Sequence, residues 1–499
     1  MLKTITEKQR NAGSESAALI PSARWALTSL SLSMLMPSLD TSIANAGLPT
    51  LAASLDASFQ EVQWIVLAYL LAITALIVSV RRLGDLVGRR RLLLSGIALF
   101  TAASLVCGAA PSLWVLVAAR AVQGLGAAVM MSLTVALVGT TVSKAKTGGA
   151  MGLLGTMSAI GTTLGPSLGG LMVAGLGWRI IFLINVPVGV LNFALAHRYL
   201  PADLPVAGKR PGFDVLGTVV LALTLAGYAL SMTTGGGRFG PANLALFAAA
   251  LLGVGVFVVV ENRSGSPLIR WSMIRDPELA SRLAMSTLVS TVIMATLVVG
   301  PFYLSEGLAL GSVLVGLSLS VGPLVAALAG VPAGRIVDRF GARPTTFAGL
   351  TGMAAGAAVV AVMPASYGVA GYLAPIVVVT GSYALFQTAN NTGMMTNILP
   401  EQRGVVSGMM SLSRNLGLIT GASVIGAVFA FASGAADHAA HTPAAVAFGA
   451  RTTFVVASSL TLAALLIAVA ARAIARRPVR HHASAADTGI YDGKLAVRA

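Results

Sequence analysis

The chain has 499 residues, of which 56% are hydrophobic and only 10% are charged, and its mean hydropathy is +0.85. Because soluble domains carry about a quarter charged residues, this composition excludes a soluble globular protein and indicates an integral membrane protein. The net charge of +16 does not indicate a nucleic-acid-binding protein, since aromatic residues make up only 6% and no basic cluster falls on a soluble domain. The single cysteine, Cys107, excludes an intrachain disulfide and a thiolate metal site.

Apolar runs long enough to cross a membrane recur along the chain, and such a run needs about 20 residues. Residues 1–24 are polar, and we expect a cytoplasmic N-terminal tail there rather than a signal peptide. Each later run is interpreted as one transmembrane helix. The fourteen runs lie near 25–46, 62–80, 92–110, 113–142, 149–175, 178–197, 215–232, 242–260, 283–303, 311–333, 345–364, 367–389, 405–432 and 452–471.

The distribution of basic residues orients these helices, because Lys and Arg in short loops stay on the cytoplasmic side. With the N-terminus inside, 28 of the 33 Lys and Arg residues fall in segments that are expected to be cytoplasmic. Only Arg238 and Arg451 fall in outer loops. We therefore expect a multi-pass protein of the cell (inner) membrane with both termini in the cytoplasm.

Two patterns repeat along the chain at nearly the same offset, which indicates duplicated halves. The segment 81–91 (RRLGDLVGRRR) returns 253 positions later as 334–344 (GRIVDRFGARP), and the glycines of 161–170 return 256 positions later. The expected fold is an all-α integral membrane protein with two six-helix bundles. Its parts are bundles at 25–200 and 283–471, a linker at 201–282 with two inserted transmembrane helices, and a basic disordered cytoplasmic tail at 472–499.

Asp40 is the only acidic residue well inside an apolar run. A charged carboxylate at that depth costs about 2.5–3.5 kcal/mol, and ionisable residues there usually mark ion or substrate pathways. We expect Asp40 to bind and release a proton. Arg120 is its candidate partner, because an arginine cannot lose its charge and needs an acid or a cavity. The alternative is a permanent ion pair that only orders helix packing.

The fifth apolar run contains GTTLGPSLGG, whose candidate functional residues are Gly161, Gly165, Pro166, Gly169 and Gly170. Glycines allow another helix to approach closely, and a proline bends a helix. The alternative is an ordinary packing face. The second-half copy has Ala422 in place of the proline, so a kink is predicted in the first half only.

The two charged turns are predicted to form ion pairs that hold the cytoplasmic side closed, although they could serve topology alone. The candidate gating residues are Asp85, Arg89, Arg90, Gly334, Arg335, Asp338 and Arg339. Polar residues in apolar runs are candidates for a substrate cavity, with a solvated helix end as the alternative from Asn391 onward. They are Asn185, Gln387, Asn390 and Arg414.

Motifs for covalent chemistry and cofactors are missing from the sequence. It contains no G-x-x-x-x-G-K-[ST] pattern, and the five histidines have no metal-binding spacing. We therefore expect no enzyme activity, no cofactor, no metal and no nucleic-acid partner.

These motifs resemble those of the major facilitator superfamily over nearly the whole chain. The segment 81–91 is similar to the family's signature between its second and third helices, and 334–344 is a closer copy. LVAARAVQG at 116–124 and GTTLGPSLGG at 161–170 resemble the fourth-helix motif and the fifth-helix motif of proton antiporters. LDTSIANAGLP at 39–49, WRIIFLINVPVG at 178–189 and FDVLG at 213–217 are similar to the fourteen-helix drug:proton antiporter branch.

The resemblance implies a monomer that exports lipophilic small molecules in exchange for protons, by alternating access to a central cavity. Arg81 and Leu86 depart from the usual signature, which has glycine and a basic residue there. The second-half spans contain no acid, and Glu306 stands only at the outer end of the ninth span, so broad export of divalent cations is not expected. The alternatives are an exporter or importer of one metabolite on the same fold, and a receptor or scaffold that transports nothing.

Overall fold

The computed structural model describes residues 21–77, 79–142, 147–203, 214–234, 240–263, 276–396, 398, 403–434 and 442–475, and every regular element in this part is helical. The N-terminal tail, most of the C-terminal tail, Lys146 and Lys209 lie outside the described residues. The first half holds α2 (Pro21–Ser54), α3 (Phe59–Ile77), α4 (Val80–Val87), α5 (Arg89–Ala109), α6 (Leu113–Thr141), α7 (Thr147–Leu176), α8 (Ile180–Leu183) and α9 (Asn185–Tyr199).

The linker and the second half continue the same pattern. The linker contains α10 (Val215–Thr233) and α11 (Pro241–Arg263). The second bundle begins at Pro277, ahead of the expected boundary at 283. It holds α13 (Pro277–Phe302), η2 (Tyr303–Gly307), α14 (Ser312–Phe340), α15 (Ala342–Val362), η3 (Ala365–Tyr367), α16 (Gly368–Met395), α17 (Arg403–Thr420), η4 (Gly421–Ile425), α18 (Gly426–Ser433) and α19 (Pro443–Ala475).

Thirteen helical segments of the described part are long and apolar enough to cross a membrane. The fourteenth predicted span is α2, a helix of 34 residues that is less apolar because Ser, Thr, Asn and Asp40 interrupt it. It packs against α6, α7 and α9 inside the first bundle, so its polar side chains face protein rather than lipid. The structure therefore has the all-helical architecture that the sequence predicts.

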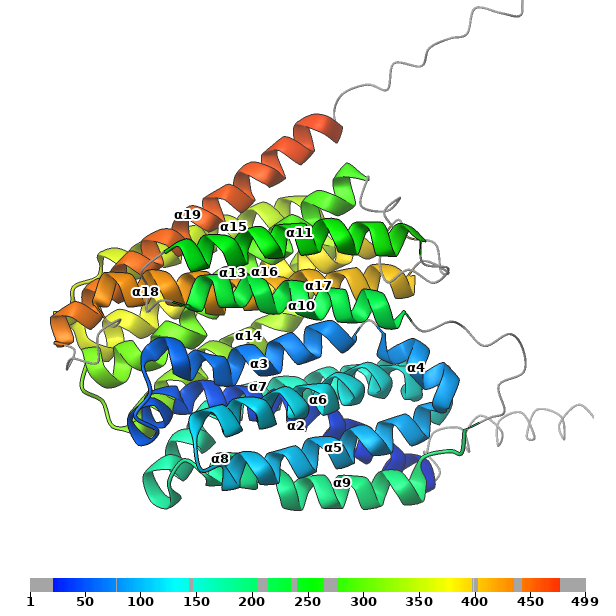
Figure 1. Cartoon of the computed structure of the whole chain (residues 1–499). Coiled ribbons are helices and arrows are strands. Elements are labelled where there is room, and N and C mark those ends of the chain that lie inside the picture. The colour runs from blue at the N-terminus through cyan, green and yellow to red at the C-terminus, as the bar shows by residue number, and fades with distance from the viewer. Residues whose placement is uncertain are drawn as a thin grey trace, which may run out of the picture.

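Equivalent helices pack together in the two halves. Figure 1 shows the halves as separate layers, blue to cyan below and yellow to orange above. In the first half α7 packs along α2, and in the second half α17 packs along α13. In Figure 1 the green helix α10 lies in front of the boundary between the layers, and α11 lies above it, in front of the upper layer. α10 contacts α3 of the first half as well as η4 and α18 of the second, so the inserted pair covers one seam.

The charged turns are short hinges between helices rather than open loops. Gly88 separates α4 from α5 with a φ of 106°, and Gly341 separates α14 from α15 with a φ of 84°. Only glycine adopts such backbone angles without strain, which explains the glycine in both copies. We call the membrane face that carries these hinges the basic side, and the other face the opposite side.

The two halves meet tightly toward the opposite side. Phe59 of α3 lies 4.6 Å from Phe302 of α13 and 4.8 Å from Phe429 of α18, measured between ring centroids. All three rings are at least 95% buried and belong to one apolar cluster drawn from both halves. This cluster seals the space between the halves at the opposite side.

The kink predicted at Pro166 stays a prediction, and the helical irregularity that the structure shows lies in the other half. α7 runs as one α-helix across Pro166. Its second-half counterpart is interrupted at Gly421–Ile425 by a π-helical turn that separates α17 from α18. A π-helical turn also interrupts a helix without a proline, and such turns are frequent at functional positions.

Candidate functional site

Asp40 lies at the centre of a buried polar cluster in the first half. The Arg120 guanidinium donates to Asp40 Oδ2 over 2.5 Å, and both side chains are fully buried. Two amides complete the shell, because Gln123 Nε2 and Asn185 Nδ2 donate to Asp40 Oδ1 over 2.9 and 2.7 Å. The carboxylate accepts three N–H bonds and has a cation beside it, an arrangement that is complementary to its ionised form.

Arg120 is held on three further sides. Its Nε donates to the Ile65 carbonyl over 3.1 Å, and its Nη1 donates to Gln123 Oε1 over 2.6 Å. The guanidinium lies over the ring of Tyr69, 4.2 Å from the centroid. The cluster therefore joins α2, α3, α6 and α9 around two opposite charges, which offsets the cost of burying them in the membrane.

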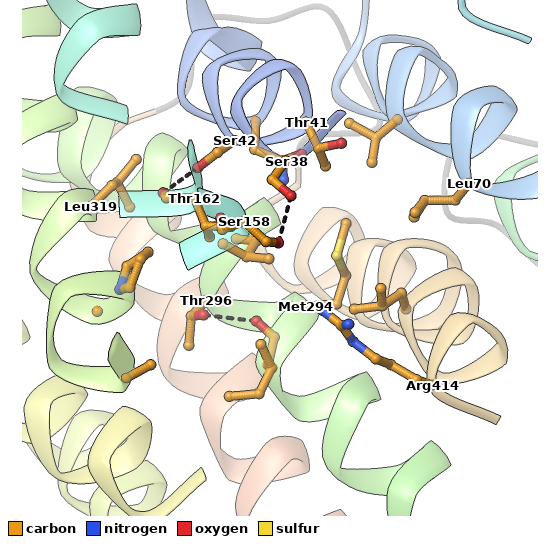
Figure 2. Close-up of a pocket in the computed structure, with 18 of the residues that line it drawn as sticks. Ser38, Thr41, Ser42, Leu70, Ser158, Thr162, Met294, Thr296, Leu319 and Arg414 are labelled. Carbon is orange, nitrogen blue, oxygen red and sulfur yellow. Dashed lines mark hydrogen bonds between the residues drawn. The ribbon is translucent and has the colours of Figure 1, made fainter. Parts of the chain in front are cut away.

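A cavity of about 310 Å³ lies between the two halves. Figure 2 shows its wall, with Ser38, Thr41 and Ser42 from α2 facing Ser158 and Thr162 from α7, and Met294 and Arg414 from the second half. Its volume is in the range of small-molecule binding sites, and most of its lining is apolar with a few polar groups. Tyr69 and Thr41 line the cavity, whereas Asp40 does not. Tyr69 therefore stands between the cavity and the Asp40 cluster.

Of the four residues predicted to line the cavity, only one does so in the structure. Arg414 is part of the lining, but Asn185, Gln387 and Asn390 are not. Asn185 is the first residue of α9, and its side chain donates to Asp40. Asn390 is buried behind the wall and donates to the Arg282 carbonyl over 3.1 Å. These three residues do not line the cavity of this conformation, so their role in binding substrate stays a prediction.

The glycines of α7 mediate close helix contacts. A Cβ atom added at Gly161 would lie 2.8 Å from the Leu35 carbonyl oxygen, and one at Gly169 would lie 3.1 Å from Ile43 Cγ2, both on α2. Gly165 meets Ser42 of the same helix. Gly170 points the other way, toward α14, where Ser167 and Ser320 also form a hydrogen bond of 2.6 Å between hydroxyls. The motif thus connects α7 to its own half and to the other half.

The charged hinges form ion pairs within their own halves. Asp85 pairs with Arg89 one turn later over 2.8 Å, and in the second half Arg343 and Arg282 both pair with Glu278. Arg335, Asp338 and Arg339 are exposed at the basic side, and Gly334 has no atom within 4 Å of an added Cβ. The gating role of these residues stays a prediction.

Asp203 is a contact residue that the sequence analysis missed. Its carboxylate accepts the backbone N–H groups of Arg90 and Arg91 over 2.8 and 3.2 Å, at the start of α5. Arg90 in turn donates to the carbonyl of His197 near the end of α9. A carboxylate at a helix N-terminus is stabilising, so the first charged hinge is fastened to α9 and the residues after it.

Gln123 and Tyr69 were missed as well. Gln123 follows Arg120 by three residues, which places both on one helix face, and this spacing was a usable signal. Tyr69 carries no comparable signal, because an aromatic residue in an apolar run is ordinary.

A central cavity between two repeated helical halves, sealed at one side, defines a membrane transport protein. The chain belongs to the Major Facilitator Superfamily, whose sequence model matches residues 30–422. Members of this family are membrane transporters and not enzymes. The identification covers both halves, so the predicted family is confirmed.

Three relatives place the chain within the family. It is 32% identical over 410 residues to "Uncharacterized transporter YebQ" of Escherichia coli, with 81% of this chain and 89% of YebQ covered. It is 32% identical over 407 residues to "Multidrug resistance protein Stp" of Mycobacterium tuberculosis, covering 81% and 75%. It is 26% identical over 408 residues to "Riboflavin transporter RibZ" of Clostridioides difficile, covering 82% and 88%.

A solved transporter shares the fold. The structure of a bacterial homolog of the human lysosomal transporter Spinster, in an inward-facing and occupied conformation, superposes with a TM-score of 0.67. The alignment covers 91% of this chain and 98% of that one, at 13% sequence identity. This likeness establishes the architecture and leaves the transported compound open.

Proposed function

We propose that this transporter exports lipophilic small molecules in exchange for protons, by alternating access. The observation that carries the proposal is the buried Asp40–Arg120 pair, whose Arg120 lies against Tyr69, a residue of the cavity lining. The named identity of Stp as a multidrug resistance protein supports the direction and the substrate class.

The cluster supplies a way to couple a proton to a change of conformation. Protonation removes the Asp40 charge and leaves the Arg120 guanidinium, which stays charged, without its counter-ion in a dry site. The helices that carry the two groups, α2 and α6, then favour a different arrangement. Because Tyr69 contacts Arg120 and also lines the cavity, a bound substrate senses the same change.

The conformation in the structure fits one half of this cycle. The halves are sealed at the opposite side by Phe59, Phe302 and Phe429, and Asp40 is arranged as an ionised carboxylate. With the basic side in the cytoplasm of the inner membrane, this arrangement matches the inward-facing state that follows proton release in the proposed cycle. Substrate then enters from the cytoplasm or the inner leaflet.

Transport of a single metabolite is the second candidate. RibZ, named as a riboflavin transporter, aligns with this chain over nearly the same length as Stp. A panel of chemically unrelated compounds separates the two candidates, because a dedicated transporter moves one compound class only.

The proposal is tested by Asp40→Asn in proteoliposomes with a proton gradient. We expect this variant to lose uphill export while downhill exchange continues, and its transport to lose its dependence on pH. Asp56→Asn is the matched control, because it removes an exposed acid of the same half and should keep uphill export. Uphill export by Asp40→Asn would exclude Asp40 as the coupling residue.

The orientation is tested separately by cysteine labelling. The only native cysteine, Cys107, is buried and gives a low background. Cysteines at Ser58 and Thr442 should react with an impermeant reagent from outside the cell, and cysteines at Lys146 and Lys209 should not. Labelling of either lysine position from outside would reverse the topology.

A further inference from the structure

Arg414 is the charged residue of the cavity. Every other described residue that lines the cavity is uncharged. Arg414 lies eleven residues into α17, so it stands about 16 Å along the helix from its start at the basic side. This depth is well inside the membrane, where an arginine needs an acid, a cavity or both.

The two deep arginines of the protein differ in their surroundings. Arg120 has an acidic partner and is fully buried. Arg414 is exposed within the cavity, and among the described residues no carboxylate and no hydrogen-bond acceptor contacts it. Figure 2 shows its side chain extending from α17 toward the middle of the cavity. A permanent cation with five N–H donors is therefore presented to whatever enters.

Two hydrogen-bond donors on the same wall of the cavity also lack a partner among the described residues. Asn415, next to Arg414, and Tyr383 of α16 line the cavity and have no hydrogen-bond partner in the described part of the chain. The hydroxyl groups on the facing wall are different, because Ser42 donates to the Thr162 carbonyl and Thr41 donates to the Pro37 carbonyl. Free donors therefore lie beside Arg414 on the second-half wall, where a ligand can supply the acceptors.

We propose that the cavity selects amphipathic organic anions, whose carboxylate or sulfonate group binds Arg414 while their apolar part packs against Leu70, Met294 and Leu297. The inference rests on the proposed export function and adds its substrate class. Guanidinium pairs with such oxyanions through two parallel N–H bonds, a geometry that an ammonium group does not match. A cationic drug would instead face an unpaired positive charge in a low-dielectric cavity.

The charge of the substrate determines the electrical character of the cycle. If one proton enters for each exported monoanion, both movements carry positive charge inward, and two charges cross per cycle. Exchange of one proton for one monovalent cation moves no net charge. Anion export should therefore speed up when the inside is made negative at constant pH, and cation export should not.

The experiment uses three probes of nearly the same shape: naphthoate, naphthamide and naphthylmethylammonium. Binding to the purified full-length protein and export from proteoliposomes are measured for each. We expect naphthoate to bind about tenfold more tightly than the amide, because hydrogen bonds to charged groups are the strong ones. The ammonium probe should bind most weakly.

Substitutions in the cavity test whether Arg414 causes the preference for naphthoate. Arg414→Gln should reduce the preference for naphthoate to within about twofold of the amide, and Arg414→Lys should restore part of it. Thr296→Val is the matched control, because it changes another residue of the lining without changing charge and should keep the preference.

The outcomes separate this inference from the function on which it rests. Equal binding of all three probes, or preferred export of the ammonium probe, would overturn the anion preference and leave proton-coupled export standing. Arg414-dependent binding of naphthoate without proton-driven export would support the anion site and overturn the coupling. Failure of all three probes to bind or to be exported would count against both.

Discussion

Gly170 of α7 and Gly316 of α14 touch backbone to backbone across the boundary between the two halves. A Cβ atom added at Gly316 would lie 3.1 Å from Gly170 Cα, and the reverse distance is 3.2 Å. The repeat places a related contact at the other seam, where Gly426 of α18 packs against the amide of Gln63 on α3. The glycines that recur in the two halves therefore include residues that form both seams.

This contact predicts that Gly316→Val blocks transport without removing the protein from the membrane. The added side chain collides with the Pro166 carbonyl and with Gly170, and overpacking of this kind costs about 1–3 kcal/mol. Transport should fall at least several-fold while the amount of protein in the membrane stays unchanged. Gly155→Val is the control, because no atom lies within 4 Å of a Cβ there. Similar losses from both substitutions would contradict the proposed seam.

The Asp40 cluster predicts that substitution of an uncharged residue, Asn185, shifts the pH dependence of transport. Asn185→Leu removes one of the three N–H donors to the carboxylate, and hydrogen bonds to charged groups contribute about 1.5–3 kcal/mol. The ionised form loses that stabilisation, so the pH dependence of transport should shift toward higher pH. The measurement is the rate of export at a series of internal and external pH values.

Asn192→Leu is the matched control for this prediction. Asn192 lies on α9 as well and contacts α2, but its partners are the hydroxyl groups of Ser29 and Ser33. Its loss should lower the thermal unfolding midpoint and leave the pH profile in place. If Asn185→Leu behaves in the same way, the cluster is a structural ion pair and not a proton site.

The sequence shows which charged residues lie deep in apolar runs, but it does not show which residues they contact. Asp40 and Arg120 stand out because each is a rare ionisable residue in an apolar run, and the two are indeed paired. Asn185 was recognised as unusual, but the sequence did not show that its side chain donates to Asp40 rather than lining the cavity. Helix periodicity reports which residues share a face, but it does not report which other helix covers that face.

The fold was predictable for a related reason. Membrane helices must satisfy their backbone hydrogen bonds internally, so length and apolarity suffice to count them. α2 is the informative exception. It is too polar to count as a membrane-spanning helix by composition, and yet it packs inside the first bundle. Asp203 shows the opposite limit, since a single acid in a polar linker gives no sign that it will bind the start of α5.

Asp203 and Asp85 lie near the same hinge but have different partners, so we predict that their substitution lowers the stability of the protein by different amounts. Asp203→Ala leaves two backbone N–H groups of α5 without their acceptor, which costs about 1 kcal/mol. Asp85→Ala breaks an exposed i, i+4 pair, which contributes about 0.3–0.5 kcal/mol. Thermal unfolding in detergent should therefore show the larger decrease for Asp203→Ala. A larger decrease for Asp85→Ala would mean that its carboxylate has a role beyond this pair.

The seal at the opposite side predicts that Gln63→Leu slows transport while it stabilises the protein. Gln63 is 1% exposed, and neither polar atom of its amide has a hydrogen-bond partner among the described residues. A buried polar group without a partner costs about 1–3 kcal/mol. The amide stands against Gly426 across the seam, so it destabilises the closed seam and not the first half as such.

Leucine removes that cost and keeps the apolar contact with the seam, so the closed arrangement gains stability relative to the open one. A gain of about 1.4 kcal/mol changes the ratio of the two conformations tenfold, and each transport cycle must open this seam. We expect a higher thermal unfolding midpoint together with a several-fold lower turnover number in proteoliposomes. Thr134→Val provides the comparison, because the Thr134 hydroxyl is also buried without a partner but lies on α6 inside the first half. It should raise the unfolding midpoint without slowing transport, and equal effects of both variants on turnover would contradict a specific role of Gln63 in the seam.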